Sequence, residues 1–261
     1  MSRFNPERFR LTLGVDSLTL ATRTRLTPWR FSAAINYNSQ IVSTAFQPRL
    51  QQLLKAHVPR GREVSVVVDD RLTRYFIVTP PDRLNSFADL RTITALRFLT
   101  LFGDKAVDWE MQAEWAAGRP FLVCALPRTL KATVLSELKA GGWQSGGMKP
   151  ESVWIWNDCA RRMRDPQGWF ARIGAGHILL AASNAGHVVA VSMSNGPPAE
   201  GADALRAVLM RESLRWDRPL PSKLYLSQTR SGAMESLHGQ HIDAVGVVLL
   251  RPDFLEQESF A

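Results

Sequence analysis

The loop Arg172-Ile173-Gly174-Ala175-Gly176-His177 carries two glycines and could bring its backbone close to a phosphate group. Its Gly174-Ala175-Gly176 segment is only a GxG, and neither the GxGxxG nor the GxxxxGK[ST] phosphate-binding motif occurs in the chain. The loop also lacks the carboxylate that nucleotide chemistry would need there. A nucleophilic serine in a GxSxG turn is absent as well. No residue pattern therefore dictates a reaction.

Two pairs of acidic residues are candidates for a metal site. Asp69-Asp70 follows an expected strand, where carboxylates can bind a metal ion, but such a pair also commonly makes a turn, here into Arg71. Asp203 and Glu212 are too far apart along their expected helix to form one site. The five histidines and two cysteines lack the paired spacing of metal ligands. We therefore predict no metal site, and reduced, buried cysteines.

The chain is strongly basic. It has 32 Lys and Arg against 24 Asp and Glu, which gives a net charge of +8. This charge suits a nucleic acid, an acidic protein or an anionic membrane surface. The densest basic run, Arg161-Arg162-Met163-Arg164, lacks the interleaved aromatic residues that stack on single-stranded nucleic acid. Nucleic-acid binding is therefore the less favoured interpretation, and it would predict a steep loss of affinity with salt.

The length and composition favour a folded cytosolic protein. Hydrophobic residues make up 45% of the 261 residues, which is enough for a full core. No apolar run approaches the roughly 18 residues that a membrane span needs. The first ten residues carry charges where a signal peptide would have its apolar stretch. We therefore expect the chain to stay in the cytosol.

The same order of elements is predicted twice. The first copy has strands near 8–15, 18–25, 31–37 and 63–68, with a helix near 48–57 before the last strand. The second copy has strands near 169–173, 177–183, 187–193 and 223–226, with a helix from about 202 to 216. Little residue identity links the copies, so the repeat is one of pattern. It predicts two similar lobes.

Additional elements are predicted between the copies. They are strands at 74–78, 107–115 and 121–126, and helices at 86–102 and 129–140. Ser86 and Asp89 form a capping box for the first of these helices, and Gly103 ends it. The stretch 143–150 is rich in glycine and serine, so we expect it to be the crossing between the lobes.

Two tryptophans follow this crossing. Trp154 and Trp156 alternate with Val153 and Ile155, which predicts a strand with both indoles on one face. An exposed aromatic pair would mark a partner surface. We favour the alternative, in which the tryptophans form a core at the junction of the lobes.

The duplicated order of three strands, helix and strand, with an insertion in the first copy, resembles the actin-like ATPase superfamily. In that fold two glycine-containing turns, one per lobe, hold phosphates, and a third loop with paired glycines holds adenine. The resemblance implies that 13–17 is the first phosphate turn, 172–177 the second, and 224–230 the adenine loop. Within the superfamily the chain is most similar to the pilus-assembly protein PilM and the cytoplasmic part of the secretion protein GspL. This similarity rests on 64–78 and on the run from 86 to the Gly141-Gly142 pair.

All three loops depart from the pattern of the superfamily. After Asp16, Ser17-Leu18 replaces the expected glycine and hydroxyl residues, and we expect the Leu18 side chain to lie where backbone should approach a phosphate. Arg172 replaces the acid that would hold Mg²⁺ through water, and an arginine can pair with phosphate but cannot ligate a cation. Thr229-Arg230 replaces the paired glycines of the adenine loop. ATP hydrolysis is therefore not expected.

The resemblance implies an α/β fold with two actin-like (ribonuclease H-like) lobes and a small inserted subdomain in the first lobe. The expected limits are 1–145 for the first lobe, with the insertion at about 71–118, and 146–261 for the second. We predict no catalytic residue, no metal and no cofactor. Residual ATP binding stays open at the altered loops, through Gly14, Asp16, Ser17, Gly174 and Gly176.

The resemblance implies a non-catalytic scaffold of a bacterial type IV pilus or type II secretion-like machine. Such a scaffold would lie at the cytoplasmic face of the inner membrane, held there by its partners. It would bind the cytoplasmic tail of an inner-membrane component or the assembly ATPase, and homodimerisation stays open. The alternatives are an ATP-binding actin-fold enzyme, either an ATPase or a kinase, and the less favoured nucleic-acid-binding protein.

Overall fold

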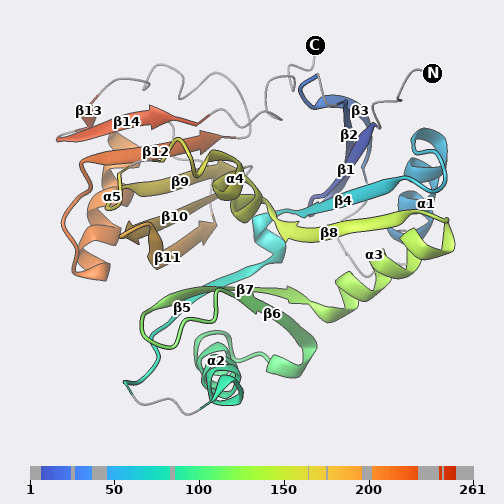
Figure 1. Cartoon of the computed structure of the whole chain (residues 1–261). Coiled ribbons are helices and arrows are strands. Elements are labelled where there is room, and N and C mark those ends of the chain that lie inside the picture. Colours follow the sequence, from blue (N-terminus) through green and yellow to red (C-terminus); the bar gives the residue numbers. More distant parts are fainter. Residues whose placement is uncertain are drawn as a thin grey trace.

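The computed structural model describes residues 7–24, 27–36, 46–82, 86–163, 165–174, 176–195, 202–228, 241–242 and 244–250 (Figure 1). The first lobe is built on a five-stranded sheet with the order β3-β2-β1-β4-β8. Its elements are β1 (Arg8–Leu13), β2 (Ser17–Arg23), β3 (Arg30–Asn36), α1 (Phe46–His57), β4 (Glu63–Val68), α3 (Arg128–Ala140) and β8 (Gln144–Pro150).

The second lobe repeats this arrangement in a six-stranded sheet with the order β11-β10-β9-β12-β14-β13. Its elements are β9 (Trp169–Gly174), β10 (His177–Asn184), β11 (His187–Asn195), α5 (Ala202–Trp216), β12 (Lys223–Gln228), β13 (His241–Ile242) and β14 (Val245–Leu249). In both sheets the first three strands are antiparallel, and the first strand pairs in parallel with the fourth. The predicted repeat of pattern and the two-lobed α/β fold are confirmed.

The alternation in β1 fixes which face of the first sheet is buried. Phe9, Leu11 and Leu13 are all buried in one core together with Leu50 and Leu53 of α1. Because side chains alternate across a strand, these three residues lie on the same face of the sheet. Burying each such side chain stabilises the fold by about 1.5–3 kcal/mol. This core fixes the end of β1, where the first glycine turn begins.

A separate three-stranded sheet with the order β5-β7-β6 forms the inserted subdomain. Its elements are β5 (Arg74–Val78), α2 (Phe87–Phe102), a short 3-10 helix η2 (Ala106–Asp108), β6 (Trp109–Ala113) and β7 (Phe121–Pro127). Ser86 caps α2, accepting a hydrogen bond from the Asp89 amide at 3.2 Å, and the left-handed Gly103 ends the helix as predicted. The sheet continues through β7 to Pro127, beyond the predicted limit of 118, and β5 and β7 lie against β11 of the second lobe.

The predicted crossing at 143–150 is wrong, because most of it is strand β8. This strand pairs in parallel with β4, which extends the first sheet to Pro150, past the predicted lobe boundary at 145. The glycines of this stretch had indicated a loop. Gly147 has a φ of +93°, and the pairing shifts register between Val64 and Val66, as expected at a bulge in an edge strand.

The lobes are instead connected by helix α4 (Glu151–Cys159), so the strand predicted at 153–156 is also wrong. Four residues are too few for alternation to distinguish a strand from a buried helix. The favoured core role of the tryptophans is confirmed. Trp154 lies 6.4 Å from the Trp29 ring of the first lobe, and Trp156 lies 5.6 Å from the Phe170 ring of the second. Among the described residues, no helix is long and apolar enough to cross a membrane.

Candidate functional site

The first glycine turn, Gly14 to Ser17, is the tight hairpin between β1 and β2. The Gly14 amide donates a hydrogen bond to the Ser17 carbonyl at 2.8 Å. A Cβ at Gly14 would lie 2.8 Å from Ser17 Oγ and 3.0 Å from the Ser17 carbonyl oxygen, so a larger residue there would have to shift Ser17 within the turn. Asp16 is exposed at its tip. The expected position of Leu18 is wrong, because the alternation of β2 buries this side chain fully in the core of the first lobe.

The second glycine turn connects β9 to β10. Gly176 has a φ of +76°, which favours glycine, and Gly174 makes room for the imidazole of His177. A Cβ at Gly174 would lie 2.0 Å from His177 Cε1, and His177 is 1% exposed. Ala175 lies outside the described residues. The surface above Gly174 is therefore covered by a side chain of the same turn.

Two acidic segments meet these turns at the junction of the lobes. Asp69 and Asp70 follow β4, and Glu151 follows β8. Because β4 and β8 are parallel neighbours, their carboxyl ends lie at the same edge of the sheet. The Asp69 amide donates to the Leu13 carbonyl at 2.9 Å, which ties the first turn to this edge.

Asp69 has the turn-forming role that the sequence favours. Its carboxylate accepts hydrogen bonds from the Arg71 amide at 2.9 Å and from Arg71 Nη2 at 2.7 Å. The hydrogen bond to Asp69, with further attraction from Asp16 and Glu151, raises the pKa of the Arg71 guanidinium. The first turn, the acidic segment and the start of α4 therefore belong to one electrostatic cluster.

Asp70 points inward and is completely buried. Its Oδ1 accepts hydrogen bonds from the Tyr75 hydroxyl and from the Ser152 amide at 3.0 Å, while Oδ2 accepts one from Ser152 Oγ at 2.6 Å. His177 Nε2 of the second lobe lies 3.6 Å from Oδ2. Burial opposes ionisation of Asp70, but His177, Ser152 and Tyr75 together hold the pKa of this carboxyl below its usual value. Asp70 is thus a structural carboxylate that stays ionised.

Arg172 forms the second contact between the lobes. Its side chain is fully buried, and Nη2 lies 2.7 Å from Glu151 Oε1. Its Nη1 also donates to the Ile173 carbonyl at 3.2 Å. Burial raises the pKa of Glu151, and the adjacent Arg172 guanidinium acts in the opposite direction. An arginine at this position therefore neutralises the acid that begins the connecting helix α4.

The three acidic residues that meet at the junction are engaged by neighbouring side chains. A general base needs a carboxylate that can accept a proton from a substrate, yet Asp69, Asp70 and Glu151 are each engaged by a neighbouring side chain. In the described part of the chain, no group of three or more His, Cys, Asp and Glu residues could hold a metal ion. The third loop cannot be compared, since Thr229-Arg230 lies outside the described residues.

The structure brings both predicted glycine turns to one place, around Asp70. Sequence reasoning missed Glu151, Ser152 and His177 as members of this cluster. The available signals were the position of Glu151 directly after Pro150 and the presence of a histidine at the end of the second turn. Neither signal indicates a contact partner, because each partner lies on an element distant in the sequence.

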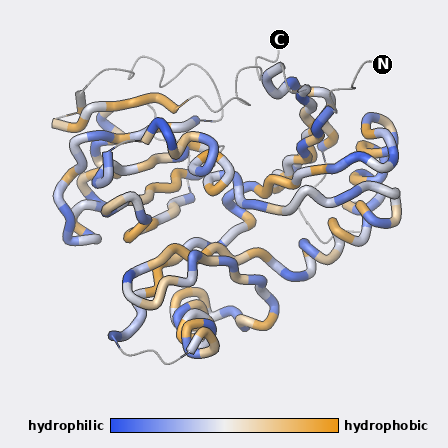
Figure 2. Tube along the Cα trace, viewed as in Figure 1, coloured by the Kyte–Doolittle hydropathy of each residue, from blue (hydrophilic) through white to orange (hydrophobic). Residues whose placement is uncertain are grey.

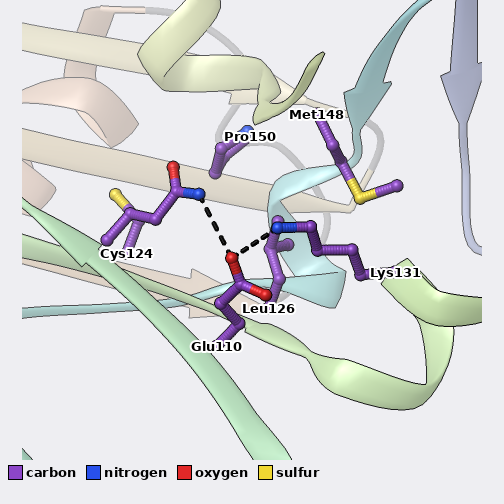
Figure 3. Close-up of a pocket in the computed structure, with 7 residues that line it drawn as sticks. Glu110, Cys124, Leu126, Lys131, Met148 and Pro150 are labelled. Carbon is purple, nitrogen blue, oxygen red and sulfur yellow. Dashed lines mark hydrogen bonds and ion pairs between the residues drawn. The ribbon is translucent and has the colours of Figure 1, made fainter. Parts of the chain in front are cut away.

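A small crevice separates β8 from the inserted subdomain (Figure 3). It is lined by Glu110, Gln112, Cys124, Leu126, Lys131, Met148 and Pro150. Lys131 donates a hydrogen bond to Glu110 across it, as the dashed line in Figure 3 marks. Its volume of about 10 Å³ is at the lower limit for a single water molecule. In this conformation the crevice is too small for a ligand larger than water.

Comparison with known proteins identifies the fold. No family model matches the chain, and a search of the curated proteins found no match. A chain of the PilM–PilN type IV pilus biogenesis complex has 15% sequence identity over 95% of this chain and 89% of its own length, with a TM-score of 0.62. The cytoplasmic domain of EpsL, an inner membrane component of the type II secretion system of Vibrio cholerae, has 12% identity over 85% and 82%, with a TM-score of 0.56.

A third similar structure is a Bacteroides thetaiotaomicron protein with an actin-like ATPase fold and unknown function. It has 9% identity over 97% of this chain and 95% of its own length, with a TM-score of 0.59. At such low identities the likeness concerns the fold. The predicted resemblance is thereby confirmed at that level: the chain has a two-lobed, actin-like fold similar to those of PilM and the cytoplasmic domain of EpsL.

Proposed function

We propose that this protein is a non-catalytic cytoplasmic scaffold of a bacterial type IV pilus or type II secretion-like machine. It binds the cytoplasmic tail of an inner-membrane component, or the assembly ATPase, and its partners hold it at the inner membrane. Two of the similar structures support this proposal, because one belongs to a pilus biogenesis complex and the other to a secretion system. The net charge of +8 suits a position near anionic lipid.

The pairing of Arg172 with Glu151 is the observation that supports a non-catalytic role. In a nucleotide clamp, charged groups at the junction of the lobes must be available to phosphate and cation. Here the guanidinium and the carboxylate neutralise each other at 2.7 Å, and the His177 ring covers the glycine of the second turn. A phosphate would have to displace both contacts before it reached the backbone.

The partner is tested by affinity purification of the tagged, full chain from native cells after mild cross-linking. An inner-membrane assembly component or a secretion-type ATPase should be enriched. Nuclease treatment and an unrelated tagged protein of similar net charge control for capture through basic residues alone. Failure to enrich any such component in repeated preparations would reject the scaffold proposal.

The alternative, an ATP-binding enzyme of this fold, is tested by thermal unfolding with and without Mg²⁺ and ATP. A ligand that binds only the folded state stabilises it by about 2.7 kcal/mol at a hundredfold excess over its dissociation constant. We expect no shift of the unfolding temperature at millimolar nucleotide. A clear upward shift together with ATP turnover would favour the enzyme, whereas a shift without turnover would leave a nucleotide-binding scaffold.

A further inference from the structure

The outer end of the first lobe gathers basic side chains that are far apart in the sequence. At this end β2 stops and the other four strands of its sheet begin, so it lies opposite the glycine turns and the junction. Figure 2 shows hydrophilic residues at this end, around the turn between α1 and β4. With histidine counted as neutral, the described charged residues that reach the surface here are Arg8, Arg23, Arg30, Lys55, Arg60, Arg62 and Lys139 against Glu7, Glu63 and Glu137. The surface is therefore basic.

Strand pairing sets four of the arginines in a row. Arg8 and Arg23 are directly opposite each other in β1 and β2, and Arg30 of β3 is opposite Thr22 of β2. On the other side β1 runs parallel to β4, so Arg62, the residue before β4, continues the row. Neighbouring strands are about 4.8 Å apart, so these four backbone positions span about 14 Å. The row therefore forms a broad positive edge of the lobe.

The seven basic side chains have no counterion within the described part of the chain. None of them forms an ion pair or a side-chain hydrogen bond with a described residue, whereas the ion pairs that are found there all lie elsewhere, from the junction to α5. The carboxylate of Glu137 accepts a hydrogen bond from Gln51 Nε2 at 2.6 Å instead. Like charges directly opposite each other weaken a strand pair, so Arg8 and Arg23 oppose the pairing of β1 with β2. An anion from outside the chain would relieve this repulsion.

The aromatic residues at this end distinguish between anionic partners. The Trp29 ring is only 3% exposed, and the Arg23 and Arg10 guanidinium groups lie 4.6 Å and 4.8 Å from its centre. Single-stranded nucleic acid needs a series of accessible rings for its bases, and Phe31, at 36% exposure, offers one. An apolar ring beside arginines suits the interface of a lipid bilayer, where the ring enters the headgroup layer and the charges stay near the phosphates.

We propose that the outer end of the first lobe binds an anionic phospholipid surface directly through its five arginines, Arg8, Arg23, Arg30, Arg60 and Arg62. Strand ends and turns at one end of a lobe can approach a plane together, and each basic residue near an anionic bilayer adds to the attraction. Lys55 and Lys139 lie in the last turns of α1 and α3, where a cation also offsets the helix dipole, so the arginines carry the inference. The contact goes beyond the proposed function, in which partners hold the protein at the membrane.

Co-sedimentation of the purified full chain with large vesicles tests this contact without any partner protein. Vesicles of phosphatidylcholine with about 30% phosphatidylglycerol should bind the chain at about 50 mM salt and release it at about 500 mM, because salt screens the attraction. Vesicles of pure phosphatidylcholine should not bind it.

Two triple variants locate the contact. R8Q/R30Q/R60Q should weaken binding to the anionic vesicles about 100-fold, at roughly fivefold for each cation. The matched control R91Q/R97Q/K105Q removes the same charge from exposed residues in and after α2 and should weaken binding less than about threefold. Since Arg8, Arg30 and Arg60 form no ion pair with a described residue, the first variant should unfold at the temperature of the native chain or slightly above it. Circular dichroism verifies the fold of both variants.

Three results would overturn the inference. They are no binding to the anionic vesicles at low salt, equal losses of binding in the two triple variants, and binding to a random DNA duplex that is tighter than binding to the vesicles and is abolished in R8Q/R30Q/R60Q. The second would mean that net charge rather than this surface attracts the lipid, and the third would assign the surface to nucleic acid. Because no partner protein is present, each of these failures would leave the scaffold proposal to its own test.

Discussion

Replacing Arg172 with methionine should destabilise the protein far more than the loss of its packing would. The arginine is fully buried in β9 of the second lobe, and its guanidinium lies 2.7 Å from a Glu151 carboxylate that is only 13% exposed. Methionine fills a similar volume without charge. The variant therefore leaves Glu151 buried at the start of the connecting helix α4 with its counterion removed, while the apolar contacts of the arginine stem are largely kept.

The size of the effect follows from the burial of both partners. Breaking a buried ion pair by removing one member costs about 3–5 kcal/mol. Because Glu151 retains slight exposure, we expect about 3 kcal/mol, which is roughly a 100-fold change in the ratio of folded to unfolded protein. The variant E151Q should lose a similar amount, since it leaves the arginine charge buried. The double variant E151Q/R172M should lose clearly less than the two single losses added together.

Dependence on pH separates a charge effect from a packing effect. Burial already raises the pKa of Glu151 in the folded state, and losing Arg172 raises it further. An acid whose pKa is raised on folding holds its proton more tightly in the folded state than in the unfolded state. Its destabilising effect is therefore small below its unfolded-state pKa of about 4.3, grows as the pH rises from there to the folded-state value, and is constant above that value.

Urea unfolding of the four proteins, followed by tryptophan fluorescence at about pH 5 and pH 7.5, measures both features. The loss caused by R172M should be greater at the higher pH, and the loss caused by the double variant should change little. A loss under about 1 kcal/mol for R172M, or additive losses in the double variant, would refute the ion-pair argument.

Two further predictions concern the same junction. Asp70→Asn should destabilise the protein at neutral pH. Folding lowers the pKa of Asp70, so the ionised carboxylate stabilises the folded state fully above about pH 3.9, and this stabilisation is lost as the pH falls through the folded-state pKa. Unfolding free energies measured down to about pH 3 should therefore show the difference between Asp70→Asn and the native chain shrinking with acid, and a constant difference would contradict this. Gly174→Ala should cost about 1–3 kcal/mol because its Cβ would lie 2.0 Å from His177 Cε1. Adding His177→Ala should recover part of that loss in thermal unfolding, and no recovery would mean that the turn backbone, not the imidazole, excludes a side chain.

The sequence predicts the architecture better than the contacts around Asp70 and Arg172. Secondary structure depends on residues close together in the chain, whereas these contacts join residues far apart in it. Alternation in β1 and the cap at Ser86 are local signals, and each places an element within a few residues of its observed position. The prediction that 143–150 crosses between the lobes was wrong because the local signals there are misleading. Its glycines indicate a turn when considered locally, and only the pairing with β4 makes them part of a strand.

The contacts of the cluster could not be predicted in the same way. Glu151 meets Arg172, and Asp70 meets Ser152 and His177, across elements that become neighbours only when both sheets have formed. The sequence predicts that Arg172 lies where a carboxylate would be needed. It cannot predict that a carboxylate at the start of the connecting helix pairs with it.

The pairing of Arg172 with Glu151 affects how the lobes can move. In a protein that closes its lobes around a nucleotide, like charges at the junction would keep the lobes apart until the ligand and its cation bind. Binding would then close the lobes. At this junction the Arg172 guanidinium already pairs with Glu151 at the start of α4, and His177 Nε2 of the second lobe lies 3.6 Å from Asp70 Oδ2 of the first. Moving the second lobe away from the start of α4 and from Asp70 would break both contacts and expose the fully buried guanidinium. A junction that is held closed by its own residues suits a protein that presents fixed surfaces to its partners, which is what the scaffold proposal requires.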